Sequence, residues 1–447
     1  MAASEKLDTH QKALNLNLDP SKFGSFAEIG AGQEVARWFL AVGAASGTVA
    51  KTISAYDKEV SDDLYGPGVR YVSKERLEAM LDSEWNQLLK QLQKTRGPQT
   101  RFFSFVDTIS ARNYAGTNEP HGWVGVRFQL EPGDQPNDIL LHINMRDPSN
   151  LQQQEAIGIL GVNLIHTAFH QMHTKESFLQ GLAEDLENRI EMDYVEVRGA
   201  DFAGWDKGSL LLLLVQIGLA EAVCFPAQGA PVPPSEVLYK KPVILAPGYF
   251  EHVDSTHAEI HERLLNAAIQ QYREEFREAR PPSAFFCIPA TLHVPSQGSP
   301  ESSDLLNRVE ALRARGGSVL VFREQELYAM TALVNRYTKE PVRFGVGLSL
   351  LIRAFEYRYS KLDSFLEVLS RLFAQNIRIY AYPMTAKDLK EAIKNLSATN
   401  WEWSETNGWV SANQLRLRTP AGHLYEYILA SNFLVPMQVP AAQAADA

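Results

Sequence analysis

Cysteine is nearly absent from this chain of 447 residues, which contains only Cys224 and Cys287. Two cysteines cannot build a disulfide framework or a cysteine-rich zinc site, and both lie in apolar runs where cysteine acts as a small hydrophobe. This usage favours a reducing compartment. The N-terminal segment lacks the apolar core of a secretory signal, and it carries acidic residues that transit peptides avoid. We therefore expect a cytoplasmic protein.

An excess of positive charge is also missing, because 53 acidic side chains outnumber 43 basic ones and give a formal net charge of −10. Broad binding to nucleic acid or to anionic lipid requires a basic surface field, so neither is an expected partner. A small anionic ligand remains compatible with this balance. Two or three basic groups can hold one phosphate whatever the net charge.

Long apolar runs are scarce as well. The most apolar one, residues 209–225, only reaches the lower limit of a transmembrane helix, and Gln216 and Glu221 interrupt it. We therefore expect a buried helix here and no membrane partner. The hydrophobic share of 45% and the charged share of 21% are ordinary globular values, and the length predicts two domains or one large α/β domain.

Hydrophobic periodicity predicts an α/β fold. Residues 21–149 show helical patterns followed by three strand-like runs, which indicates an α+β part. In residues 150–433 helices and strands alternate, which favours an α/β domain with flanking helices around a mixed, largely parallel sheet. The Ser/Pro-rich segment 295–303 is a candidate linker. The polar start at 1–20 and the Ala/Pro/Gln-rich end at 434–447 are predicted to be a mobile N-terminus and a disordered tail.

Three short strand-like runs in the C-terminal half are separated by helical stretches long enough for crossovers. We expect residues 318–322, 342–347 and 377–382 to lie parallel in one sheet, adjacent or nearly so. Their carboxyl ends would then share one edge, where ligands of α/β sheets bind. The loops that follow these strands form a second candidate site, at residues 322–325, 345–349 and 383–385.

Polar side chains are concentrated in residues 107–129, between two of the predicted strands. Loops held by rigid strands often carry function, since Arg clamps a carboxylate or phosphate while His, Glu and Asp move protons. The candidate acids and bases are Asp107, Glu119 and His121. The candidate ligand-binding residues are Arg112, Asn113, Asn118 and Arg127. The alternative interpretation is a solvated hairpin loop.

Two further segments are candidate contributors of ligand-binding residues. Glycines precede Lys51, Tyr56 and Asp57, but their spacing does not fit a phosphate-binding P-loop, and a close-packed helix is the alternative. Arg146 and Asp147 follow a predicted strand and precede a helix, so a ligand anion would meet both an arginine and a helix N-terminus. A surface ion pair is the alternative there.

Histidines at i, i+4 and i+7 would share one face of a helix at His166, His170 and His173. The chain has no H-E-x-x-H motif, and no further ligand is spaced to complete a site. We predict no metal centre, and metal binding by these three histidines stays an open alternative.

Several phrases resemble a poorly characterised bacterial family, namely FAEIGAGQEVARWFLAVGAASGTVAKTISAYDKEVSDDLYG, GTNEPHGWVGVRFQ, LQQQEAIGILGVNLI, PSEVLYKKPV, RYTKEPV and IRIYAYPM. Members of that family often carry the labels TonB-dependent receptor or nicotinate-nucleotide adenylyltransferase, and the resemblance extends over about residues 15–435. The motifs support neither label. An outer-membrane receptor needs an export signal and many alternating strands, and an adenylyltransferase of the α/β class is expected to show a T/H-x-G-H motif after a strand.

We therefore predict a cytoplasmic enzyme that acts on a small anionic metabolite, phosphorylated or nucleotide-like. Its reaction class is open, with a transferase among the options, and the motifs identify no cofactor. The alternative is a non-catalytic scaffold or regulatory protein that acts through a homo-oligomer or a partner complex. That alternative predicts that the polar groups of residues 107–129 are satisfied internally.

Overall fold

The computed structural model describes residues 7–438 except 69, 249, 251–254, 278–279, 291–301, 356–364, 374–375, 395–399 and 420. The chain forms two compact units, residues 1–220 and residues 221–447, here called the N-terminal and C-terminal units. Each is an α/β structure built on its own sheet, which confirms the predicted fold class. The N-terminal unit extends past the boundary predicted near residue 150, because α5 and β6 pack with its sheet. The predicted linker lies almost entirely outside the described residues.

The sheet of the N-terminal unit has the strand order β2-β1-β3-β4-β5-β6. Strands β2, β1 and β3 run parallel, whereas β3, β4, β5 and β6 pair antiparallel. Nearly every residue of the central strands is buried, so helices cover both faces. The strands are β1 (Lys22–Ile29), β2 (Val49–Ile53), β3 (Arg101–Ser110), β4 (His121–Phe128), β5 (Asn137–Met145) and β6 (Ile190–Arg198).

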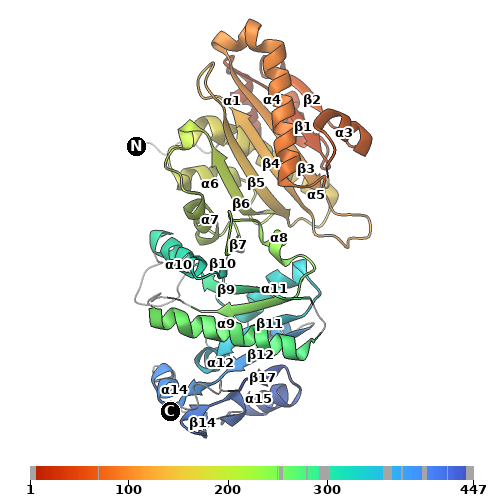
Figure 1. Ribbon diagram of the computed structural model, residues 1–447. Coiled ribbons are helices and arrows are strands. Elements are labelled where there is room, and N and C mark those ends of the chain that lie inside the picture. Colours follow the sequence, from red (N-terminus) through yellow and green to blue (C-terminus); the bar gives the residue numbers. More distant parts are fainter. Residues whose placement is uncertain are drawn as a thin grey trace. The chain divides into compact units, whose positions relative to one another are not determined.

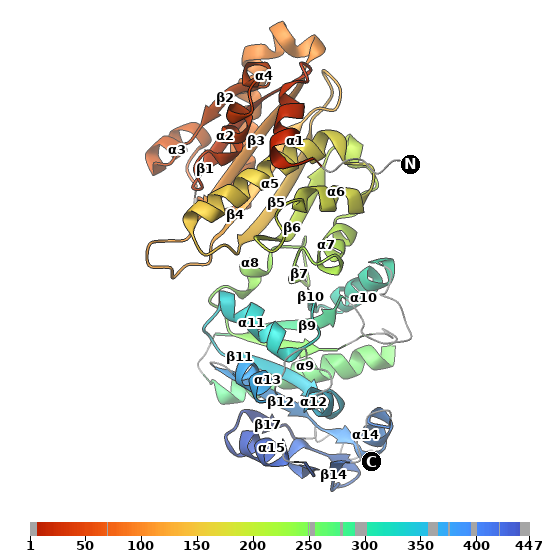
Figure 2. The ribbon, with the colours of Figure 1, turned by 180° about the vertical axis from the view of Figure 1, so that it is seen from behind.

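Helix α4 lies along one face of this sheet (Figure 1), and α1, α2 and α5 lie on the other (Figure 2). Ser73 caps α4 by accepting a hydrogen bond from the backbone N–H of Arg76, as expected of a serine before a helical period. Gly125 of β4 has no side chain, and this lets Leu77 and Leu81 approach the sheet closely. The helices are α1 (Thr9–Asn17), α2 (Glu34–Ala41), α3 (Lys58–Tyr65), α4 (Lys74–Arg96), α5 (Asn150–His170), α6 (Lys175–Ala183) and α7 (Lys207–Gln216).

Two segments differ from their sequence-based predictions. Residues 9–17 were expected to be mobile, but Asp8 and Gln11 form a capping box, and Ala13 and Leu16 are fully buried, so α1 packs on the unit. The apolar run 209–225 does not form one helix, because α7 ends at Gln216 and the chain continues into a strand of the other unit. In the part of the chain that is described, no helix has the length and apolar character needed to cross a membrane.

The sheet of the C-terminal unit has the order β17-β12-β11-β8-β9-β10-β7. All neighbours run parallel except β7, which pairs antiparallel with β10. The predicted parallel arrangement of residues 318–322, 342–347 and 377–382 is therefore confirmed. The strands are β7 (Ala222–Phe225), β8 (Val243–Pro247), β9 (Ser283–Pro289), β10 (Ser318–Phe322), β11 (Val342–Gly347), β12 (Ile377–Tyr382) and β17 (Leu434–Pro436).

Helices flank this sheet on both faces, with α9 on one side (Figure 1) and α11 and α13 on the other (Figure 2). Two small antiparallel pairs, β13 (Met384–Thr385) with β15 (Trp409–Val410) and β14 (Trp401–Trp403) with β16 (Leu415–Leu417), follow β12. Strand β17 lies in the segment predicted to be a disordered tail. The helices are α8 (Pro234–Leu238), α9 (Ser255–Glu275), α10 (Ser302–Ala314), α11 (Leu327–Tyr337), α12 (Leu348–Phe355), α13 (Phe365–Leu372), α14 (Ala386–Ala392) and α15 (Ala421–Ala430).

Candidate functional site

Three side chains form a hydrogen-bonded chain across neighbouring strands of the N-terminal unit: Asp193 on β6, His142 on β5 and His121 at the start of β4. Nδ1 of His121 lies 3.1 Å from Nε2 of His142, and Nδ1 of His142 lies 2.6 Å from Oδ1 of Asp193. Asn144 holds the second carboxylate oxygen, because its Nδ2 donates to Oδ2 of Asp193 at 2.8 Å. We call Asp193, His142 and His121 the histidine relay.

Strand register and one bulge bring these residues together. His121 and Asn144 are direct cross-strand partners, so their side chains share one face of the sheet. His142, two residues before Asn144, projects from the same face. The register between β5 and β6 shifts between His142 and Ile143, which leaves Asp193 without a direct cross-strand partner. Such bulges re-aim a side chain, and here the carboxylate of Asp193 is aimed at His142.

The hydrogen-bond pattern assigns the protons of the relay. A carboxylate only accepts, so Nδ1–H of His142 donates to Asp193, and Nε2 of His142 accepts from Nδ1–H of His121. Nε2 of His121 is then an unprotonated nitrogen, and no described residue hydrogen-bonds it. Burial, helped by His142 and by the positive charge of Arg70, lowers the pKa of His121 to about 4, so the ring is neutral at pH 7. A neutral, oriented imidazole is a general base.

Two residues border the relay. The ring centroid of Trp123 lies 5.0 Å from that of His142 and 5.4 Å from that of Tyr194, so Trp123 fills the space between the relay and a second polar group. Arg70 is exposed and precedes α4. Its charge acts on His121, which places a cation beside the relay. The relay is thus buried at its Asp193 end and reaches partial exposure at His121.

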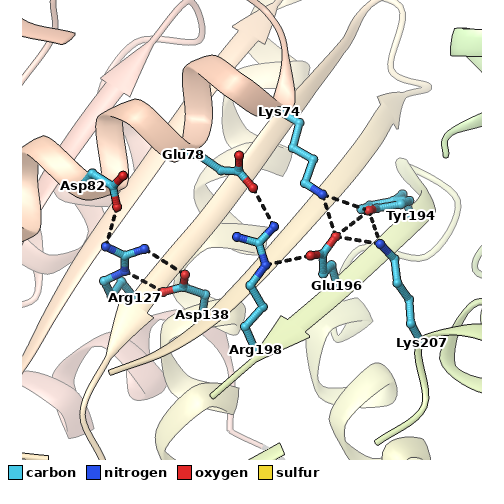
Figure 3. Close-up of polar contacts among 9 residues, drawn as sticks. All are labelled: Lys74, Glu78, Asp82, Arg127, Asp138, Tyr194, Glu196, Arg198 and Lys207. Atoms are coloured by element: carbon cyan, nitrogen blue, oxygen red, sulfur yellow. Dashed lines mark hydrogen bonds and ion pairs between the residues drawn. The ribbon is translucent and has the colours of Figure 1, made fainter. Parts of the chain in front are cut away.

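The second polar group joins Tyr194 and Glu196 of β6 to two lysines (Figure 3). Lys74 donates to Tyr194 Oη at 3.2 Å and to Glu196 Oε2 at 2.7 Å. Lys207 donates to the same two oxygens, at 2.5 and 2.7 Å. Burial raises the pKa of Glu196, but hydrogen bonds from Lys207, Lys74 and Tyr194 outweigh it and hold that pKa well below its usual range. Arg198 also bonds Glu196, at 2.7 Å, so positive charge exceeds negative charge around this carboxylate.

The relay uses one of the three predicted acids and bases, His121. Glu119 is exposed in the preceding loop. Asp107 is fully buried on the opposite face of the sheet, directly across from Glu28 of β1. Burial and the adjacent Glu28 raise the pKa of Asp107 well above its ordinary value, and burial raises the pKa of Glu28 to about 7. Backbone N–H groups of Val35 and Ala36 donate hydrogen bonds to Glu28, so the first turn of α2 holds this carboxyl group in place.

The polar loop between β3 and β4 forms its own hydrogen bonds. Asn113 receives a bond from the N–H of Thr117 and donates to its hydroxyl. Asn118 accepts from the N–H of Asn113 and donates to the carbonyl of Ala111. Arg112 is exposed, and its backbone N–H bonds Gln153. The two asparagines therefore fix the loop conformation.

Most of the other predicted ligand-binding residues hold contacts within the protein. Arg127 is bound through two nitrogens to Asp138, at 2.7 and 2.9 Å, and by a third to Asp82 (Figure 3). Burial lowers the pKa of Arg127, but the two carboxylates raise this pKa by a larger amount, so the net shift is upward. Three of the remaining residues form ion pairs, Lys51 with Glu84, Arg146 with Glu191 and Asp147 with Arg189. Asp57 accepts hydrogen bonds from the first N–H groups of α3. Tyr56 is 76% exposed.

The described residues contain no group of three or more His, Cys, Asp or Glu side chains arranged to hold a metal ion. His166 and His170 do stack on one face of α5, with ring centroids 4.7 Å apart. Burial is the largest influence on both rings, and it lowers their pKa values to about 3 and about 4. Lys22 contacts Nε2 of His170, which adds a positive charge where a metal would need a ligand.

Sequence reasoning missed His142, Asp193 and Tyr194, because they lie inside strands rather than in loops. The sequence did contain a signal for these residues, because each is a polar side chain within an apolar run, DILLHINM or RIEMDYVEV. Buried polar groups need partners, so a His in one strand and an Asp in another indicate a contact. Strand order decides which pairs meet, and that order is not visible in the sequence.

No family model matches the chain, and no match is found among curated proteins. Among solved structures, the competence/damage-inducible protein CihA from Agrobacterium tumefaciens is 17% identical over 36% of this chain and 96% of its own, with a TM-score of 0.26. A CinA-superfamily protein from Enterobacter cloacae is 11% identical over 38% of this chain and 96% of its own, with a TM-score of 0.28. The first is a competence/damage-inducible protein and the second a competence-damaged (CinA) superfamily protein, and neither is a TonB-dependent receptor. At these TM-scores the likeness assigns no residue a role.

Proposed function

We propose that the protein is an enzyme in which His121 acts as the general base on a small anionic substrate. The observation that carries this proposal is the histidine relay, in which the buried carboxylate of Asp193 orients His142, and His142 orients His121. The relay ends on an unprotonated Nε2 that no described residue occupies. A nitrogen held in this way accepts a proton from a bound water or a substrate hydroxyl without first reorienting.

The charges around the relay support an anionic substrate. Arg70 lies close enough to influence His121 electrostatically. Lys74, Lys207 and Arg198 surround the single carboxylate of Glu196 farther along the same face, although Glu78 offsets part of this charge. An anion in front of His121 would find positive charge in this part of the unit despite the negative net charge of the chain.

The test is a turnover screen of the full chain against phosphate esters, nucleotides and carboxylic amides, followed by kinetics on any substrate found. We expect His121→Gln to lower kcat about 10²- to 10⁴-fold with a small change in KM, since general-base catalysis contributes this much. His10→Gln, at an exposed position of α1, is the matched control and should behave as wild type. A substrate that is turned over equally fast by His121→Gln would refute the proposal.

Asp193→Asn separates positioning from folding. The amide is nearly isosteric, but its NH₂ group cannot accept from His142, so the ring would adopt the wrong tautomer. We expect a loss in kcat with unchanged thermal stability at pH 7 and an altered pH–rate profile. The wild-type profile should be flat at neutral pH and fall as His121 becomes protonated near pH 4.

A scaffold function is the second candidate, and the hydrogen bonds of the loop before β4 favour it. Asn113, Thr117 and Asn118 satisfy one another, as that alternative predicts. Light scattering after size-exclusion chromatography tests it. A stable homo-oligomer, combined with no turnover in the screen, would support the scaffold, whereas a catalytically active monomer would exclude it.

A further inference from the structure

Ser110, the last residue of β3, lies beside His121 across the hairpin that joins β3 to β4. The two residues are direct cross-strand partners, so their side chains project from the same face of the sheet, and the Cβ atoms of such partners are about 4.5–5.5 Å apart. Both side chains are partly exposed, because β3 ends and β4 begins at this pair. A serine hydroxyl therefore stands at the exposed end of the histidine relay.

The orientation of the His121 ring turns its unprotonated nitrogen toward this serine. In an imidazole ring, Nδ1 and Nε2 lie on opposite sides of the line through Cβ and Cγ. Strand β4 lies between β3 and β5, and Nδ1 of His121 is directed at His142 on β5, at 3.1 Å. Nε2 is therefore turned toward the β3 side, where Ser110 is the direct partner of His121.

The hydroxyl of Ser110 has its own hydrogen available for a base. Nδ2 of Asn118 donates to Oγ of Ser110 at 3.4 Å and to the carbonyl oxygen of Ala111 at 2.8 Å. A hydroxyl that accepts from an amide still has one O–H to donate. In the described part of the chain no acceptor takes this hydrogen, and Oγ is not hydrogen-bonded to Nε2 of His121. Contacts between a nucleophile and its base are often longer in a protein without substrate.

A second hydroxyl on the same face of β3 has a structural role. Thr108 lies two residues before Ser110, but it is 1% exposed and donates its hydrogen to the carbonyl oxygen of Tyr71. A buried hydroxyl whose hydrogen is already used cannot attack a substrate. The same bond fixes Tyr71 beside the end of β3, on the side of the sheet where the charge of the neighbouring Arg70 acts on His121. Positive charge thus lies near the pair of Ser110 and His121.

We propose that Ser110 is the nucleophile of an acyl hydrolysis and that the substrate is a small ester or amide with a negative charge. This inference rests on the function proposed for His121 and names its reaction. Ser110, His121, His142 and Asp193 lie on four consecutive strands, in the order hydroxyl, imidazole, imidazole and carboxylate. A hydroxyl, a base and an orienting carboxylate form acyl-transfer machinery by their geometry and not by their sequence positions.

The reaction has two steps, and His121 carries the proton in both. In the first, Oγ of Ser110 bonds the carbonyl carbon and its proton moves to Nε2 of His121, and the leaving oxygen or nitrogen takes that proton as its bond to the carbon breaks. In the second, a water molecule gives a proton to Nε2 and its oxygen bonds the same carbon. The bond from the carbon to Oγ then breaks, and Oγ takes the proton back from Nε2.

Covalent labelling of the full chain tests the nucleophile before any substrate is known. The probes are a fluorophosphonate and phenylmethylsulfonyl fluoride, which lose fluoride to an activated serine, and peptide mass spectrometry locates the adduct. We expect an adduct on Ser110 that is absent in Ser110→Ala. His121→Gln should be labelled about 10²-fold more slowly or worse, the size of a general-base effect. Ser54→Ala, at an exposed position after β2, is the matched control and should be labelled as wild type.

Two further measurements separate the nucleophile from folding and from the base. Ser110→Ala removes one partly exposed oxygen, so it should unfold at the wild-type temperature. On a substrate found in the turnover screen, Ser110→Ala should lose about as much kcat as His121→Gln, because residues that act as a unit are not additive. If His121→Gln lowers turnover and Ser110→Ala does not, the nucleophile is refuted and the base stands, whereas an inert His121→Gln refutes both.

The labelling result can also overturn the inference by itself. It does so if neither probe labels Ser110 in the wild-type chain, or if Ser110 is labelled in His121→Gln at the wild-type rate.

Discussion

The two units place their polar chemistry in different parts of a sheet. In the N-terminal unit the relay runs across the face of antiparallel strands, where direct partners such as His121 and Asn144 lie side by side. In the C-terminal unit the parallel sheet is covered on both faces, and the pairing of its central strands β8 and β11 stops at Leu245 and Phe344, before either strand ends. Antiparallel pairing builds rows of side chains, whereas parallel winding leaves an edge of backbone groups and helix ends.

The comparison extends to charged side chains in the two units. In the C-terminal unit, Glu275 of α9 receives hydrogen bonds from Arg343, Arg378 and Tyr380. The side chain of Arg343 is 0% exposed. In the N-terminal unit, Arg198 pairs with Glu78 and Glu196 but is 41% exposed. Burial makes the first network a structural requirement and leaves the second close to water.

The largest effect is expected for Glu275→Ala. This change leaves the fully buried guanidinium of Arg343 without its carboxylate, and breaking a buried ion pair in this way costs about 3–5 kcal/mol of stability. Denaturant unfolding followed by circular dichroism measures it. Glu367→Ala, which breaks an exposed pair on α13, is the control. A loss below about 1 kcal/mol for Glu275→Ala would contradict the importance given to burial.

A pH-dependent effect of intermediate size is expected for Asp107→Asn. Burial raises the pKa of Glu28 from 4.5 to about 7 in the folded protein. The stability linked to this proton is therefore fully present below pH 4.5 and is lost as pH rises through 7. An amide at position 107 removes the adjacent carboxyl and can donate to Glu28. Wild type should thus lose on the order of 3 kcal/mol between about pH 4.5 and pH 7, where the unfolded chain has released this proton and the folded protein keeps it, while the variant loses less.

Urea unfolding at pH 4.5 and pH 8 checks this prediction, and Asp134→Asn in an exposed turn serves as the control. If wild type and Asp107→Asn lose the same stability between these pH values, Asp107 does not contribute to the raised pKa of Glu28. In that case the face of the sheet that holds Glu28 and Asp107 would show no pH-dependent coupling that distinguishes it from the face that carries the relay.

The smallest effect is expected for Arg198→Gln. Its ion pairs are partly exposed and screened by water, so the variant should lose less than about 1 kcal/mol. Thermal unfolding at low and moderate salt measures the difference. A loss as large as that of Glu275→Ala would mean that the charged network in Figure 3 is a structural core element rather than a surface one.

The part of the fold that the sequence predicts well is the alternation of short apolar strands and long helices. Strands β10, β11 and β12 follow this pattern and are parallel, as expected. What the pattern does not contain is strand order, because pairing partners are set by tertiary packing rather than by local periodicity. The reversal between β8 and β11 and the return of β17 to the sheet edge follow from that order.

The candidate site likewise has one part that the local sequence predicts and one part that depends on strand order. His121 was predicted because it lies beside a polar loop, which is a local signal. Its partners His142 and Asp193 lie 21 and 72 residues farther along the chain, and only the β4–β5–β6 order and a bulge bring them together. Arg127 was predicted as an anion clamp, but two carboxylates that the sequence places far apart from each other, Asp82 and Asp138, pair with it.

The central claim is that Asp193 and His142 fix His121 as a neutral base whose Nε2 is unprotonated. Nitrogen-15 NMR of the imidazole rings, with His121 assigned by its loss in His121→Gln, tests this without any substrate. The account predicts that His121 at pH 7 is protonated at Nδ1 and unprotonated at Nε2, and that it titrates with a pKa near 4. A proton on Nε2 at pH 7, or titration near the ordinary histidine value of about 6.5, would contradict it.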